Sequence, residues 1–213
     1  MHLYAFGSVV RGEISQDSDI DLLAIVEGYD PRFDPDVFSI YSYARLEELW
    51  AEGNPFAWHL ALESKLLYAA DSSDFLKMLG TPRKYSAGLQ DCGKFYDLFK
   101  TASAELLSAS SSPVFNLSTV FLSLRNFASC FLLEFGSHPD FSRHAALRLG
   151  AEDIPICHKA YTILERARIL STRGRGPNLT APEITAAVAE LEKIDGWMQT
   201  LLRKAIDHAR IQQ

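Results

Sequence analysis

Two carboxylates separated by one residue are the side chains of this sequence best suited to chemistry. Asp19 and Asp21 flank Ile20, and the branched and apolar run 20–26 predicts a buried strand. Alternate side chains of a strand project to one face, so both carboxylates are expected to lie side by side. Such a pair repels itself, and a hard cation such as Mg²⁺, which prefers oxygen ligands, relieves the repulsion. The pair therefore predicts a magnesium site.

A glycine–serine pair ahead of these carboxylates adds a phosphate-binding pattern. Residues 3–6 are apolar and aromatic and predict a first strand that ends at Gly7. Gly7 permits a tight turn in which backbone N–H groups approach a phosphate, and Ser8 adds a hydroxyl donor. In the following loop, Arg11 supplies a cation and Ser18 a further hydroxyl for the nucleotide. These residues together predict a site for a metal-bound nucleoside triphosphate.

The spacing of these residues resembles the signature of the polymerase-β-type nucleotidyltransferases. Gly7-Ser8, ten intervening residues and Asp19-x-Asp21 are similar to the motif of the minimal nucleotidyltransferases, a group with antitoxin-like members. The resemblance implies a mixed α/β fold, two Mg²⁺ ions at the aspartates, and transfer of a nucleoside monophosphate to an acceptor. It also implies a helix ahead of the Gly-Ser turn, for which the sequence has no room. A covering partner, a trimmed fold or an upstream start would each account for this.

A third carboxylate, which the superfamily usually carries on the next strand, is not evident. Residues 37–43 predict this strand and contain no Asp or Glu, and Ser39 stands at the equivalent position. Glu63 is the nearest later carboxylate, whereas Asp34 and Asp36 lie just ahead of the strand. The sequence does not choose among them. A catalytically inactive, nucleotide-binding partner protein is therefore one alternative function.

His59 stands one helical turn before Glu63, in a segment that fits two kinds of secondary structure. The apolar positions of residues 56–68 fit a helix face, while residues 65–68 resemble an edge strand. The stretch that starts at Gly53 is similar to a segment of one bacterial branch of these nucleotidyltransferases. A His–Glu pair at this spacing can act as a base or orient an acceptor. The favoured interpretation is a hydrogen-bonded packing pair beneath the sheet.

Composition and charge narrow the class of protein. A chain of 213 residues, 47% hydrophobic and 23% charged, fits one large or two small globular domains. The net charge of −6 gives no global basic field for nucleic acid. Cys92, Cys130 and Cys157 are widely spaced and odd in number, which is typical of reduced thiols in a cytoplasmic protein. No apolar run is long enough to span a membrane, so no membrane partner is expected.

Beyond a linker at residues 81–83 the pattern becomes helical. We expect a nucleotidyltransferase domain over 1–82 and a helical bundle over 83–213, an α+β domain followed by an all-α one. Thr180 and Glu183 form a capping box. The expected helices cover residues 86–109, 116–135, 153–171 and 181–212.

The bundle resembles two known arrangements. One is the HEPN bundle that accompanies minimal nucleotidyltransferases in toxin–antitoxin systems. Its RNase motif begins here at Arg125-Asn126, but Cys130 stands where a His is expected. Arg203 and His208 have the spacing but lie near the chain end. We therefore expect the bundle to shape the acceptor pocket or hold a partner.

The other arrangement is the substrate-binding bundle of aminoglycoside nucleotidyltransferases. An enzyme of this type needs an acidic pocket for a polycationic substrate, and the candidate acids are Glu105, Glu134 and Asp140.

The function expected from the sequence is Mg²⁺-dependent transfer of AMP from ATP to an acceptor hydroxyl. The resemblance to antitoxin-type enzymes favours a protein acceptor, and a small molecule or a nucleic-acid end are alternatives. The base preference and the oligomeric state, a homo-oligomer included, stay open.

Overall fold

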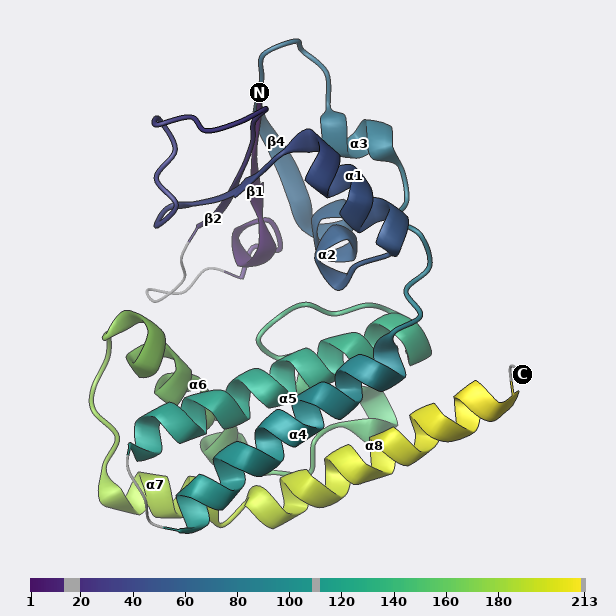
Figure 1. Cartoon of the computed structure of the whole chain (residues 1–213). Helices are drawn as coiled ribbons and strands as arrows, with labels where there is room; N and C mark the ends of the chain where they lie inside the picture. Colours follow the sequence, from purple (N-terminus) through teal and green to yellow (C-terminus); the bar gives the residue numbers. More distant parts are fainter. Residues whose placement is uncertain (14–19, 109–111, 212–213) are drawn as a thin grey trace. The chain divides into compact units, whose positions relative to one another are not determined.

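The computed structural model describes residues 1–13, 20–108 and 112–211 (Figure 1). The chain divides into two compact units, Met1–Ser86 and Ala87–Gln213. The first unit is a mixed α/β domain and the second is helical, which confirms the expected fold class. No helix in the described part of the chain is both long and apolar enough to cross a membrane.

The first unit is built on a sheet with the strand order β3-β2-β1-β4. Its strands are β1 (His2–Phe6), β2 (Asp21–Ile25), β3 (Phe38–Tyr41) and β4 (Ser64–Ala69). Strand β1 runs antiparallel to β2 and to β4, whereas β2 and β3 are parallel. The end of β1 therefore meets the beginnings of the other three strands at one edge. We call this the Gly7 edge, after the residue that follows β1.

Three helices cover one face of this sheet, α1 (Tyr43–Glu52), α2 (Pro55–Glu63) and α3 (Phe75–Leu79) (Figure 1). Alternate residues of β1 and β2 point into this layer, where they form a core with Leu46, Trp50 and Leu60 of the helices. Helix α2 starts because the Asn54 side chain accepts a hydrogen bond from the Phe56 amide at 2.9 Å. The segment with two possible interpretations is thus helix up to Glu63 and strand from Ser64.

The second unit consists of α-helices and two short 3₁₀ turns. Helix α5 is its centre, with Leu117, Leu124 and Phe127 fully buried. The helices are α4 (Gly88–Leu107), α5 (Pro113–Phe135), α6 (His158–Arg173), α7 (Ala181–Val188) and α8 (Leu191–Ile211). The predicted capping box is confirmed at the start of α7, where the Thr180 amide donates to Glu183 Oε2 at 2.8 Å.

Two helix predictions were wrong in their extent. The predicted helix 153–171 begins only at His158, and Pro155, which disfavours a helical conformation at Ile154, accounts for the loss of its first residues. The predicted helix 181–212 is divided into α7 and α8. No proline or glycine marks the break. Tertiary packing explains it, since α7 packs on α6 and α8 packs on α4.

Candidate nucleotide-binding site

Gly7 occupies a position that no other residue could take without displacing its neighbours. Its φ of +73° lies in the left-handed region, and a Cβ built on it would lie 2.7 Å from Asp21 Oδ2. The amides of Val10 and Arg11 donate to the Gly7 carbonyl at 3.1 and 3.2 Å, which closes a tight turn after β1. The predicted turn is confirmed, and its missing side chain leaves room for a carboxylate.

Asp21 is the first residue of β2 and lies opposite Phe6 in the antiparallel register. The start of a strand at the Gly7 edge leaves its side chain exposed while Leu23 and Ile25 are buried in the core. The prediction that β2 delivers a carboxylate beside the Gly-Ser turn is therefore supported by the backbone. Asp19 and Ser18 lie outside the described residues, so their predicted roles stay predictions.

Glu63 is the second carboxylate that the structure brings to the Gly7 edge. It is the last residue of α2 and comes directly before Ser64, which pairs with Phe6. Phe6 therefore has Asp21 opposite it on one side and the start of β4 on the other. The Glu63 side chain is only 13% exposed. The start of β2 and the end of α2 thus place Asp21 and Glu63 beside the same turn.

Arg11 and His59 both contact the Glu63 carboxylate. Arg11 Nη1 donates to Glu63 Oε2, and Arg11 Nε donates to Glu13 Oε2 at 2.9 Å. His59 Nε2 lies 2.9 Å from Glu63 Oε2, one helical turn earlier on α2. The His59 ring packs edge-on against Phe6, with 5.6 Å between ring centroids. Glu63 is consequently held by a guanidinium from the loop, and the imidazole of its own helix lies beside the same oxygen.

Asp21 and His59 lie nearest to the space above Gly7, and Glu63 is the neighbour of His59. The point at which a Gly7 Cβ would lie is 2.7 Å from Asp21 Oδ2 and 3.8 Å from His59 Nε2. A cation bound at this edge would meet carboxylate oxygens, which are the ligands that Mg²⁺ prefers. Among the described residues, no group of three or more His, Cys, Asp or Glu side chains is placed to hold a metal ion by itself. Substrate oxygens would therefore have to supply part of any metal shell.

The other candidates for a third carboxylate take different positions. Ser39 lies opposite Leu23 in the parallel register, two residues along the strand from Asp21. The Asp34 carboxylate accepts the Asp36 amide hydrogen at 2.9 Å and shapes the loop ahead of β3. Glu13, which sequence reasoning did not single out, pairs with Arg11. Its position two residues from Arg11 was the signal available in the sequence.

The conspicuous residues of the second unit make structural contacts. Arg125 Nη2 donates to the Phe141 carbonyl at 3.0 Å, and Cys130 is buried. His208 packs against Phe135, with 5.3 Å between ring centroids. Of the acids proposed for an acceptor pocket, Glu134 accepts from the Gly88 amide. Asp140 accepts from the Ser142 amide at 2.7 Å, whereas Glu105 is exposed.

The first unit is similar to a known protein family. Residues 2–77 match the family model described as the nucleotidyltransferase domain. This match lies within the first unit and covers less than half of the chain. The match includes all four strands and Gly7, Asp21 and Glu63. It agrees with the polymerase-β-type resemblance seen in the spacing of the motif, and it ends before the helical unit. The HEPN-like character of that unit stays a prediction.

No curated protein matches the sequence. Among solved structures, a similar one is that of the spectinomycin adenyltransferase from Enterococcus faecialis with ATP and spectinomycin. The two proteins are 12% identical, the alignment covers 93% of this chain and 91% of that one, and the TM-score is 0.47.

Proposed function

We propose that this chain is a Mg²⁺-dependent nucleotidyltransferase that transfers AMP from ATP to an acceptor hydroxyl. One observation carries the proposal: within a matched nucleotidyltransferase domain, Asp21 fills the space left by the missing side chain of Gly7, and Glu63 is held beside it. Close approach of a carboxylate to a left-handed glycine turn gives metal and phosphate a common binding edge.

The residues of the Gly7 edge have different roles in this proposal. Asp21, with Asp19, would hold Mg²⁺, which when bound neutralises charge on the attacked and leaving phosphates. Gly7, Ser8 and Ser18 would bind the phosphates through the turn and its hydroxyls. Arg11, whose guanidinium already points to this edge, adds the positive charge that phosphate oxygens require.

Glu63 supplies the third carboxylate in this proposal. The acceptor oxygen attacks the α-phosphorus, its proton passes to Glu63, and the bond from the α-phosphorus to the pyrophosphate oxygen breaks. General bases of this kind need a fixed orientation within hydrogen-bond reach of the proton they accept. Arg11 fixes that orientation by donating to Oε2, and His59 Nε2 lies 2.9 Å from the same oxygen, which leaves Oε1 of Glu63 for the acceptor.

The experiment that tests the proposal is incubation of the full chain with Mg²⁺ and ATP labelled at the α-phosphate. Candidate acceptors are the products of neighbouring genes, aminoglycosides and RNA ends. We expect label to be transferred, and Asp21→Asn to lower the rate by about a hundredfold or more while leaving the fold intact. The label identifies the acceptor class, because it is found on a polypeptide, a small molecule or an RNA.

Asp97→Asn is the matched control, since it removes the same charge from an exposed position on α4. An equal rate in Asp21→Asn and the unaltered chain would refute the metal-site assignment. No transfer to any acceptor, together with no Mg²⁺-dependent ATP binding by calorimetry, would favour the inactive partner protein.

A further inference from the structure

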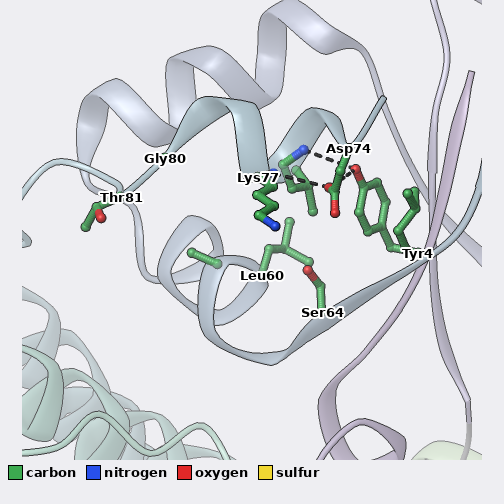
Figure 2. Close-up of a pocket in the computed structure, with 10 residues that line it drawn as sticks. Tyr4, Leu60, Ser64, Asp74, Lys77, Gly80 and Thr81 are labelled. Atoms are coloured by element: carbon green, nitrogen blue, oxygen red, sulfur yellow. Dashed lines mark hydrogen bonds between the residues drawn. The ribbon is translucent and has the colours of Figure 1, made fainter. Parts of the chain in front are cut away.

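A cavity of about 360 Å³ lies between α2, α3 and β4 in the first unit (Figure 2). Its size is in the range of pockets that bind small molecules. Its lining shares no residue with the proposed nucleotide site, because Gly7, Asp21 and Glu63 are all absent from it. Nothing in the proposed transfer reaction uses this cavity.

A carboxylate is fixed on one wall of the cavity. The buried Tyr4 hydroxyl donates to Asp74 Oδ1 at 2.9 Å and accepts from the Leu76 amide at 3.1 Å. Burial raises the pKa of the Tyr4 phenol, so it keeps its proton and continues to donate. The Lys77 amide also donates to Asp74 Oδ1, at 3.2 Å. Both donors use the same oxygen, so Oδ2 is left for a ligand.

An ammonium group faces the same space. Figure 2 shows the Lys77 side chain directed from α3 toward Leu60 and Ser64. Among the described residues, Lys77 forms no ion pair within 4.0 Å, with Asp74 or with any other acid. The far end of the cavity is fixed as well, because Trp50 Nε1 donates to the Gly80 carbonyl at 2.9 Å. The two opposite charges therefore lie on one short segment without forming an ion pair with each other.

The remaining lining is apolar with two hydroxyls. Leu60, Leu66 and Leu76 form an apolar floor, and Ser64 and Thr81 add hydroxyl groups. A purely anionic ligand would be repelled by Asp74, and a polycation by Lys77. A ligand with both charges and an apolar part satisfies the whole lining.

We propose that this cavity binds a small zwitterion, an α-amino acid with an apolar side chain. Its ammonium group contacts Asp74 Oδ2, its carboxylate contacts Lys77 Nζ, and its side chain covers the leucines. The fold has already positioned the Asp74 carboxylate and the leucines, so on binding only the exposed Lys77 side chain has to be ordered.

The test is calorimetric titration of the full chain with L-leucine, N-acetyl-leucine and leucinamide. We expect saturable binding of L-leucine. The affinity for each analogue should be about tenfold lower, since each analogue lacks one charge-assisted contact. Lys77→Met and Asp74→Asn should weaken L-leucine binding by a similar factor. Asn keeps an oxygen for the Tyr4 hydroxyl and the Lys77 amide, so this variant retains the wall.

Lys65→Met is the matched control. Lys65 is an exposed residue of β4 between Ser64 and Leu66, and alternation places its side chain on the opposite face from the cavity. Binding should be unchanged in this variant. Equal affinity for L-leucine and both analogues, an absence of saturable heat with L-leucine, or equal weakening by Lys65→Met and Lys77→Met would overturn the proposal.

Discussion

Ion pairs of similar geometry have different surroundings in the two units. In the second unit, Arg143 Nη1 lies 2.9 Å from Glu165 Oε1, and Arg166 Nη1 lies 2.6 Å from Glu183 Oε1. Each of these pairs connects helix α6 to a neighbouring segment. In the first unit, Arg11 pairs with Glu63 beside a glycine turn, and an imidazole contacts the same carboxylate.

This difference shows that charge alone does not mark a functional site. The arginines of the second unit also cap or brace the backbone, as Arg166 does at the Pro177 carbonyl. At the Gly7 edge, the backbone instead takes a left-handed conformation at a glycine. The absence of a side chain there allows Asp21 to approach. A site is distinguished by space kept open next to the charges.

The strongest test of this difference is to remove one charge from the ion pair of Glu63 and one from an ion pair of α6. Glu63→Gln should lower the transfer rate by about a hundredfold or more, because it removes the proposed general base. Glu165→Gln, the matched change on α6, should leave the rate unaltered and lower the free energy of unfolding by about 1 kcal/mol or less. Rates and denaturant unfolding would be measured on both. Equal rates in the two variants would show that Glu63 is structural too.

Filling the open space should have the next largest effect. In Gly7→Ala, the new Cβ would lie 2.7 Å from Asp21 Oδ2 at a φ of +73°, so the carboxylate must move. We expect the transfer rate to fall by up to about a hundredfold, and the free energy of unfolding to fall by about 1 to 2 kcal/mol. The control is Gly93→Ala on α4, where a Cβ would meet nothing within 4 Å and should favour the helix. Wild-type kinetics in Gly7→Ala would contradict the close approach.

His59 tests whether the contact to Glu63 orients it. His59→Leu should lower kcat by about tenfold and leave KM for ATP unchanged, because only the proposed base is released. His59→Gln, which keeps an N–H at about the place of Nε2, should restore most of the rate. Steady-state kinetics on both variants would decide. Equal losses of rate in both would indicate that the ring matters for packing against Phe6 alone.

The smallest expected effect is in the second unit and concerns pH. The hydrogen bond from the Thr180 amide, with help from Arg166, lowers the pKa of Glu183 from 4.5 to about 2. Ionised Glu183 therefore stabilises the folded state above about pH 4.5, and this contribution is lost as the pH falls through about 2. Glu183→Gln should lower Tm at neutral pH, and its Tm difference from wild type should shrink toward pH 2. Glu192→Gln, an exposed acid on α8, should show no such trend.

The turn at Gly7 and the strand that begins at Asp21 could be predicted because a turn glycine and an acid at a strand start have local signals, whereas the binding roles of these residues stay predictions. Glu63 was one of three candidates, since its position depends on β4 pairing with β1 at Ser64 and Phe6, a contact between distant residues. The same limit explains α7 and α8, which have different main packing partners, α6 and α4, and no proline or glycine between them.

Helix α2 has a consequence for how the two proposed sites influence each other. It presents His59 and Glu63 to the Gly7 edge, while Leu60 and Ala61 line the cavity. If an amino acid in the cavity changes the affinity for ATP by some factor, thermodynamic linkage requires ATP to change the affinity for the amino acid by the same factor. Through this one helical turn, the concentration of one ligand would thus change the occupancy of the site that binds the other.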